Sequence, residues 1–242
     1  MLFHIKVGSI KINNTTMDYV AFGRGTKPLV IIPGLSLNRV RGAGLSLAYM
    51  YRIFAKDTAY VMNEIGISKA CVFGVSQGGM IAQYLAINYP ELVEKLVLGV
   101  TLSRQNEIVK NAVEKWIQFA GSNDLESFIE DMLLKMYSPQ YIKKYRMLIP
   151  LMIKMSKKAD LNRFIILARS CLTCDTYEEL HKIKCSVLVL GGKQDKVVTG
   201  EASEEIAEKI KCEIYMYERL GHAAYEEAKD FNERIYKFLR KS

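Results

Sequence analysis

The chain has 242 residues, of which 50% are hydrophobic and 25% charged, and its formal net charge at pH 7 is +8. This hydrophobic content is enough for a packed core and excludes a disordered chain. No uninterrupted apolar run approaches the roughly 18 residues that a membrane-spanning helix needs, which argues against stable insertion into a membrane. The first residues lead into strand-like sequence without an apolar leader segment, so we expect a cytoplasmic protein.

Short strands are predicted at the start of the chain. Residues 10–12 and 17–22 read as the arms of a hairpin around the turn 13–16, and the apolar run 29–32 reads as a buried strand. Up to residue 100, two strand-like runs then alternate with three helical ones, namely strands at 70–75 and 95–100 and helices near 44–55, 58–65 and 78–88. Such alternation indicates a parallel sheet covered by helices on both faces.

Consecutive helices interrupt this alternation from about residue 103. One of them carries an apolar stripe over 125–136, behind an expected N-cap at Asn123. The alternation then resumes with a strand at 185–190, a helix near 201–210, a strand at 213–217 and a last helix at 224–240. We therefore expect one α/β core, residues 1–102 and 183–242, with a helical cap formed by residues 103–182.

Positive charge is concentrated in residues 135–169. This stretch holds nine of the 34 Lys and Arg residues and only one of the 26 acidic residues, Asp160, so the remainder of the chain is balanced. Such a stretch can attract anionic substrates, acyl carriers or membrane surfaces, although a solvated helix face is the simpler interpretation. No nucleic-acid-binding motif accompanies the charge, and we expect no nucleic-acid partner.

The five cysteines are an odd number and thinly spread, which favours free thiols in a reducing compartment. Cys171 and Cys174 form a CxxC pair, but no second pair and no close histidine at ligand spacing accompany them. We therefore expect neither a metal site nor a redox site.

The strongest chemical signal is Gly74-Val75-Ser76-Gln77-Gly78, a G-x-S-x-G sequence directly after an apolar strand and directly before a helix. In that setting the motif predicts a sharp turn that exposes the Ser76 hydroxyl as a nucleophile. The turn requires a strained backbone at the serine and glycines where side chains would collide.

A serine hydroxyl needs a histidine base and an acid that orients the base. Of the three histidines, His222 follows the last strand and is the predicted base, whereas His4 and His181 lie elsewhere. Asp195 follows the preceding strand and is the predicted acid, although a turn aspartate that bonds its own backbone is the competing interpretation. Three further carboxylates are weaker candidates because they belong to the helical insertion: Asp175, Glu178 and Glu179.

Attack on a carbonyl group builds negative charge on its oxygen, which two backbone N–H groups must stabilise. One predicted donor is the amide of Gln77, at the start of the helix after the nucleophile. The other is the amide of Leu35, in the turn that follows the strand 29–32.

Taken together, these segments resemble the α/β-hydrolase superfamily nearly from end to end. The resemblance is carried by Pro33-Gly34-Leu35, by Gly74 to Gly79, by the Asp195 loop, by Gly221-His222 and by the helical insertion. It implies an α/β-hydrolase fold with a mostly parallel sheet and a helical cap between the family's sixth and seventh strands. Ser76 disfavours the dehalogenase and epoxide hydrolase members, which use an aspartate there. The chain is thus similar to the branch of esterases, lactonases, thioesterases and carbon–carbon hydrolases, with 3-oxoadipate enol-lactonase-like proteins among the nearest in pattern.

Two departures from the family pattern stand out. Pro33 occupies the position of the usual histidine beside the oxyanion turn. In addition, only 21 residues separate Ser36 from Thr58, and they contain no strand, so the family's fourth strand and its connections, roughly 25 residues, are missing near Asp57 and Thr58. We expect the hairpin either to be left separate or to pair directly with the strand 29–32. The pocket wall next to the missing strand should differ as well.

The sequence therefore predicts a carboxylesterase-like serine hydrolase of EC class 3.1. Ser76 attacks an ester, thioester or lactone carbonyl, His222 transfers the proton and Asp195 orients His222. No metal or organic cofactor is required, and the partner is a small molecule that can be anionic. The alternatives are a carbon–carbon hydrolase that uses the same triad and a non-catalytic ligand-binding protein.

Overall fold

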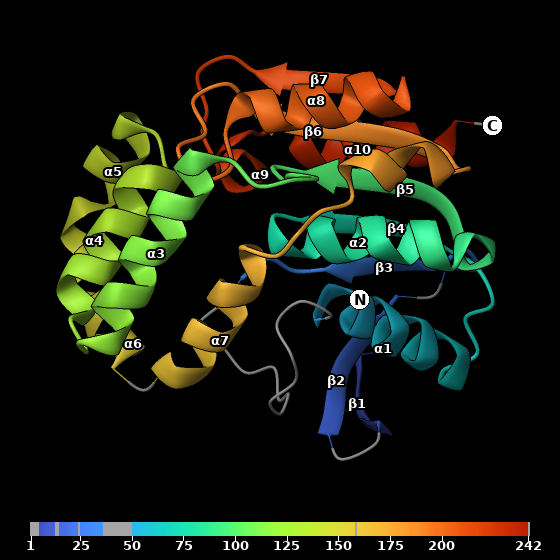
Figure 1. The fold of residues 1–242 in the computed structure, drawn as a ribbon, viewed down its shortest axis with the longest axis horizontal. Helices are drawn as coiled ribbons and strands as arrows, with labels where there is room; N and C mark the ends of the chain where they lie inside the picture. Colours follow the sequence, from blue (N-terminus) through green and yellow to red (C-terminus); the bar gives the residue numbers. More distant parts are fainter. Residues whose placement is uncertain (1–4, 13–14, 24, 36–49, 158, 242) are drawn as a thin grey trace.

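Five parallel strands form the main sheet of the computed structural model, which describes residues 5–12, 15–23, 25–35, 50–157 and 159–241 (Figure 1). The strands lie side by side in chain order: β3 (Leu29–Ile32), β4 (Ala70–Val75), β5 (Val93–Gly99), β6 (Ser186–Gly192) and β7 (Glu213–Tyr217). Every residue of β4 is buried, as expected for a central strand covered on both faces. The predicted α/β-hydrolase fold with a mostly parallel sheet is confirmed.

Helices cover both faces of this sheet and enclose two hydrophobic cores. α1 (Met50–Glu64), α2 (Gln77–Asn88) and α8 (Gly200–Ile210) cover one face, and α10 (Phe231–Arg240), preceded by the short α9 (Ala224–Glu227), covers the other (Figure 1). Alternate strand residues supply the two cores, since successive side chains point to opposite faces. In β4, for example, Val72 belongs to the core under α2, whereas Phe73 packs with Phe231 of α10.

The N-terminal hairpin forms a separate sheet of its own. β1 (Ile5–Ile12) and β2 (Thr15–Phe22) pair only with each other, antiparallel, so β1 begins earlier than predicted. Among the described residues no strand pairs with the outer edge of β3 and none lies between β3 and β4 in the chain. Of the two arrangements expected after loss of the fourth strand, the separate hairpin is confirmed and direct pairing with β3 is wrong.

One continuous helix replaces the two that were predicted around Asp57. α1 runs from Met50 to Glu64, and Thr58 lies within it, where its Oγ1 donates a hydrogen bond of 2.7 Å to the carbonyl of Phe54. The prediction of a break was wrong because a backbone with no strand to form gains one hydrogen bond for each residue that continues the helix. The part of the first predicted helix before Met50 lies outside the described residues.

The helical insertion lies between β5 and β6. It contains α3 (Glu107–Gly121), α4 (Leu125–Met136), α5 (Pro139–Tyr145), α6 (Ile149–Ser156), α7 (Leu161–Cys171) and the 3-10 turns η3 (Arg146–Leu148) and η4 (Tyr177–Lys182). α3 to α6 stand together beside the sheet in Figure 1, which supports the proposed division into a core and a cap. The N-cap of α4 is Asp124, whose side chain accepts from Ser127 N, and not the predicted Asn123, which adopts a positive φ of 57°. Within the described ranges, no helix has the length and apolar character needed to cross a membrane.

Candidate active site

Ser76 occupies the sharp turn between β4 and α2. Its backbone has φ 52° and ψ −120°, a conformation that non-glycine residues rarely adopt, so the predicted strain is confirmed. Backbone hydrogen bonds hold this conformation: Ser76 N donates to Gly99 O at 2.9 Å, and Ser76 O accepts from Gly79 N at 2.9 Å. Thr101 Oγ1 also donates to Ser76 O, at 2.7 Å. The strain persists because the surrounding contacts over-determine it.

Two glycines of the motif are required by close approach. A Cβ atom added at Gly74 would lie 2.7 Å from the Cα atom of Gly79. One added at Gly78 would lie 2.5 Å from the carbonyl oxygen of Pro33 and would also collide with the carbonyl of Ile32. Gly74 therefore allows α2 to pack closely on β4, and Gly78 allows it to pack directly against β3 and the loop after it.

Replacing Gly78 with alanine should destabilise the fold by about 3 kcal/mol, because the new methyl group meets fixed backbone atoms and not a flexible side chain. Gly121 offers a matched control at the end of α3, where an added Cβ meets nothing within 4 Å and alanine should be neutral or slightly stabilising. Urea unfolding of both variants measures the difference. Equal midpoints for Gly78→Ala and Gly121→Ala would show that the close approach is unimportant.

His222 joins Ser76 and Asp195 in one hydrogen-bonded series. Its Nε2 lies 2.9 Å from Ser76 Oγ and its Nδ1 lies 2.8 Å from Asp195 Oδ2. His222 is 3% exposed, so bulk water does not compete for these contacts. An ionised carboxylate can only accept, which assigns the ring proton to Nδ1 and leaves Nε2 as the acceptor for the Ser76 hydroxyl.

Asp195 uses its two carboxylate oxygens for different partners. Oδ2 faces His222, while Oδ1 accepts from the backbone N–H groups of Val197 at 2.7 Å and Val198 at 3.0 Å. The contacts of Asp195 are thus compatible with both interpretations, the turn aspartate and the triad acid. The two backbone donors fix the carboxylate in the orientation that the histidine needs.

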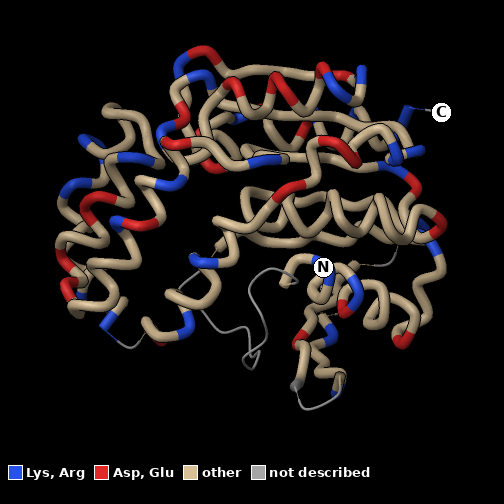
Figure 2. The backbone as a smooth tube through the Cα atoms, viewed as in Figure 1, with Lys and Arg blue, Asp and Glu red and all other residues tan. Residues whose placement is uncertain are grey.

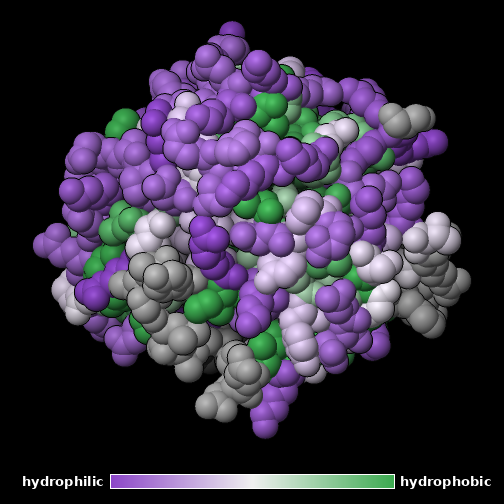
Figure 3. All heavy atoms as spheres, turned by 45° about the vertical axis from the view of Figure 1, so that its right-hand side comes forward, coloured by the Kyte–Doolittle hydropathy of each residue, from purple (hydrophilic) through white to green (hydrophobic). Residues whose placement is uncertain are grey.

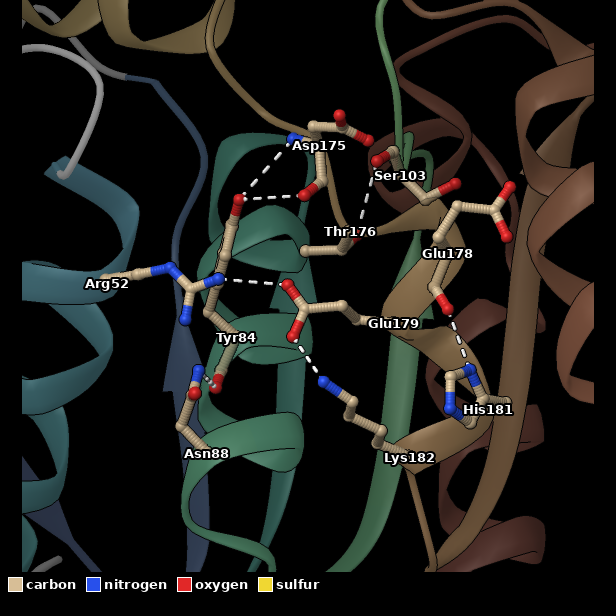
Figure 4. A network of polar contacts seen from close by, with 10 residues as sticks. All are labelled: Arg52, Tyr84, Asn88, Ser103, Asp175, Thr176, Glu178, Glu179, His181 and Lys182. Atoms are coloured by element: carbon tan, nitrogen blue, oxygen red, sulfur yellow. Dashed lines mark hydrogen bonds and ion pairs between the residues drawn. The ribbon is translucent and has the colours of Figure 1, made fainter.

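The other candidate acids and bases occupy a separate polar network on η4 and the segment before it (Figure 4). Glu179 accepts from Arg52 at 2.9 Å and from Lys182 at 2.8 Å, and the exposed His181 ring contacts the carbonyl of Glu178 at 2.7 Å. Glu178 itself pairs with Lys209, and only backbone atoms of Asp175 take part, in contact with the Tyr84 hydroxyl. His4 lies outside the described residues. The structure thus brings together Ser76, His222 and Asp195 and leaves the weaker candidates apart.

The two predicted oxyanion donors lie on segments that flank Ser76. Gln77 is the first residue of α2, and no acceptor for its backbone N–H occurs in the described part of the chain. Leu35 follows Gly34, and a Cβ added at Gly34 would be 3.2 Å from Ser76 Cβ, so this turn passes directly beside the nucleophile. Both assignments remain proposals, supported by this placement.

The sequence did not predict the hydrogen bonds that connect the cap helices to the residues around Ser76 and His222. The buried Gln77 side chain donates through Nε2 to Leu167 O at 2.9 Å and to Ser170 Oγ at 3.1 Å, which ties the nucleophile turn to α7. Next to His222, Ala223 N donates to Met136 O at 2.8 Å. A polar glutamine between a strand and an apolar helix is a weak sign of such a partner, because buried amides need hydrogen bonds. Nothing local in the sequence indicates the second contact.

The cysteines are free thiols, and Cys171 and Cys174 are buried. Burial raises the pKa of the Cys171 thiol to about 11, which keeps it protonated at neutral pH. Gln77 Nε2 also contacts Cys171 Sγ at 3.2 Å, so this thiol belongs to the packing around the nucleophile turn. Across the described residues, no cluster of three or more His, Cys, Asp or Glu side chains could hold a metal ion.

Comparison with known proteins agrees with the observed fold. A family model described as the alpha/beta hydrolase fold matches residues 15–229. Among curated proteins, 3-oxoadipate enol-lactonase 2 of Acinetobacter baylyi is 21% identical, over 86% of this chain and 86% of its own. The 2-hydroxy-6-oxononadienedioate/2-hydroxy-6-oxononatrienedioate hydrolase of Burkholderia vietnamiensis is 27% identical, over 77% of this chain and 68% of its own.

Solved structures show the same architecture. The 2-hydroxy-6-oxo-6-phenylhexa-2,4-dienoate hydrolase of Rhodococcus sp. strain RHA1 superimposes with a TM-score of 0.82 at 15% identity, covering 99% of this chain and 100% of that one. At this identity the likeness shows the fold alone. The assignment to the family rests instead on the match to the family model, which covers residues 15–229.

Proposed function

Because the chain belongs to the α/β-hydrolase family, we propose that it is a serine hydrolase that cleaves a carboxylic ester, thioester or lactone through an acyl-enzyme on Ser76. The observation that carries the proposal is the series of contacts from Ser76 Oγ to His222 Nε2, 2.9 Å, and from His222 Nδ1 to Asp195 Oδ2, 2.8 Å. This is the arrangement that nucleophilic acyl transfer requires. The name of one relative, an enol-lactonase, supports it.

In the acylation step, Ser76 Oγ attacks the carbonyl carbon while His222 Nε2 takes the hydroxyl proton. The Asp195 carboxylate stabilises the imidazolium that forms, and the amides of Gln77 and Leu35 bind the oxyanion. Collapse of the tetrahedral intermediate breaks the bond to the leaving oxygen or sulfur, which takes the proton from His222 Nε2. For a lactone the leaving oxygen stays attached to the acyl group.

In the deacylation step, water attacks the acyl-enzyme and gives its proton to His222 Nε2. The second tetrahedral intermediate expels Ser76 Oγ, which recovers that proton, and the carboxylic acid leaves. Every proton transfer uses His222, so the mechanism requires neither a metal ion nor an organic cofactor.

A substrate with a carboxylate is favoured by Arg163 of α7. This residue lies one helical turn before Leu167, whose carbonyl accepts from the Gln77 side chain. Its Nε atom is buried and has no hydrogen-bond partner among the described residues, and burial lowers the pKa of the guanidinium. The residue as a whole is only partly buried and its charge also interacts with Asp160, but an anionic ligand that accepted from Nε would satisfy this unpaired buried donor.

Labelling with a fluorophosphonate tests the proposed function. The activated Ser76 oxygen should displace fluoride and bind the phosphonyl group, giving one label per chain. His222→Ala should slow labelling by a factor of roughly 10³ or more, because the base is lost. The matched control is His181→Ala, since that ring is exposed and belongs to the η4 network. Folded wild-type protein that takes up no label would favour the non-catalytic alternative.

Carbon–carbon bond hydrolysis is the second candidate, favoured by the relative from Burkholderia vietnamiensis, whose name gives a 2-hydroxy-6-oxo-dienedioate as its substrate. Such a substrate carries a conjugated dienoate chromophore that cleavage of the carbon–carbon bond destroys, so its turnover can be followed by absorbance. Comparing kcat/KM for a 2-hydroxy-6-oxo-dienoate with kcat/KM for aryl esters and an enol-lactone separates the two. A value at least tenfold higher for the dienoate would overturn the ester and lactone proposal while leaving the triad in place.

A further inference from the structure

The helix α6 presents an apolar face to solvent. Ile149 and Ile153, four residues apart, are partly buried and pack against the main core. The outward side of α6 carries three large apolar side chains, and the preceding turn η3 adds two more. Their exposed fractions are 52% for Leu151, 37% for Met152 and 71% for Met155 on α6, and 89% for Met147 and 48% for Leu148 on η3. We call these five residues the α6 surface. No residue of α5, η3 or α6 is fully buried, so this part of the cap is an outer layer.

Large exposed apolar side chains also gather on the hairpin, where Ile5, Val7, Val20 and Phe22 are 61% to 72% exposed. On the face of the molecule that Figure 3 shows, hydrophilic side chains dominate and hydrophobic ones form small separate groups. Contiguous exposed apolar side chains usually mark a site of interaction, since leaving them in water is unfavourable. The α6 surface is therefore a candidate site of interaction, distinct from the site at Ser76.

Positive charge surrounds the same surface. No Asp or Glu occurs between Asp131 and Asp160, whereas five exposed basic side chains do, on α5, η3 and α6 and just after α6: Lys143, Lys144, Arg146, Lys154 and Lys157. None of these five forms an ion pair with a described residue. Elsewhere the charges are mixed, as over α8 and β7 at the top of Figure 2, where Lys193 pairs with Glu204.

From this combination we propose that the α6 surface binds reversibly to an anionic lipid bilayer. Long apolar side chains flanked by unpaired lysine and arginine are the chemistry that suits an interface in which acyl chains lie beneath negatively charged headgroups. The methionine and leucine side chains enter the acyl boundary, and the basic side chains contact phosphate groups. The binding is peripheral, because α6 has only eight residues.

Charge complementarity favours a bilayer over an acidic protein. Five exposed basic groups spread along α5, η3, α6 and the position after α6 do not require paired acids at fixed positions, and a fluid anionic surface can satisfy all of them at once. The charge is also large, since residues 135–169 hold nine basic residues against one acid, which equals the whole net charge of +8. The proposal does not depend on the reaction at Ser76.

Co-sedimentation of the full chain with phosphatidylcholine vesicles, with and without phosphatidylglycerol, tests the proposal. Binding should occur only when phosphatidylglycerol is present and should weaken at high salt, because the interaction of surface charges is screened. The double variant Lys143→Gln/Lys144→Gln should bind roughly 25-fold more weakly, about fivefold for each charge. The matched control Lys69→Gln/Lys211→Gln removes the same charge from two other exposed positions and should bind like wild type.

A second pair of variants tests the contribution of the apolar side chains of the α6 surface to vesicle binding. Leu151→Ser should weaken binding by about tenfold, since the side chain enters the acyl boundary. Ile108→Ser on α3 removes a side chain of the same exposed fraction, 52%, and should have no effect. Because the side chains of Leu151 and Ile108 are both exposed, the two variants should melt at the same temperature as the wild type when followed by circular dichroism. The proposal is overturned by absence of binding to anionic vesicles, by equal loss in the control variants, or by self-association in the ultracentrifuge that Leu151→Ser abolishes.

Discussion

Replacing Ser76 with alanine is expected to lower kcat for ester hydrolysis by a factor of roughly 10⁴ to 10⁶. The change removes the only atom of the proposed triad that forms a covalent bond to the substrate. The fold should remain, because the Ser76 side chain makes no capping bond to α2 and alanine keeps the same backbone strain. Stopped-flow assay of an activated aryl ester measures the loss, and urea unfolding should show a change within about 1 kcal/mol.

Ser103 provides the control for this substitution. It is also a buried serine on a segment that follows a sheet strand, and its Oγ has no hydrogen-bond partner among the described residues. Ser103→Ala should therefore keep full activity. If Ser76→Ala hydrolysed the ester at the wild-type rate, the acyl-enzyme mechanism would be wrong whatever the structure of the variant.

Replacing Asp195 with asparagine is expected to lower kcat by roughly 10⁴-fold with little change in structure. The asparagine oxygen can still accept from Val197 N and Val198 N, so the loop is kept. Its NH₂ group then faces His222 Nδ1 and donates to it, which moves the ring proton to Nε2. The imidazole can no longer accept the Ser76 proton, and the base is lost although every heavy atom stays in place.

Asp175→Asn is the matched control, because Asp175 meets the Tyr84 hydroxyl through its backbone atoms and lies on the segment before η4. Its kcat should equal that of the wild type. The tautomer argument also predicts that Asp195→Asn recovers part of its activity at high pH, where hydroxide can replace the base. A loss of the same size in both variants would mean that Asp195 acts on stability and not on His222.

Local patterns in the sequence predicted the nucleophile turn well. The strand, the G-x-S-x-G sequence and the helix are contiguous, so their geometry depends on a few adjacent residues, and the strain at Ser76 and the close approach at Gly74 and Gly78 follow from it. Element boundaries were less accurate. Asp124 and not Asn123 caps α4, and one helix spans Asp57, because several neighbouring residues can begin or continue a helix at similar cost.

Contacts between distant segments could not be predicted in the same way. The Gln77 side chain donates a hydrogen bond to the backbone of α7, 90 residues further along the chain. The backbone N–H of Ala223, next to His222, donates to Met136 O at the end of α4. Whether such groups meet depends on how the cap helices pack against the sheet. A glutamine or a helix-end carbonyl has the same local pattern whether its partner is water or another element.

The sequence by itself determined the alternation of strands and helices, the serine turn and the order of serine, aspartate and histidine along the chain. These features depend on hydrophobic periodicity and on residues adjacent to one another. Only the tertiary structure decided that Asp195, and not an acid of the η4 network, faces His222, that the hairpin stays apart from β3, and that the apolar side of α6 faces outward. Parallel strands bring their carboxyl ends to one edge of the sheet, and that packing joins groups that no local pattern connects.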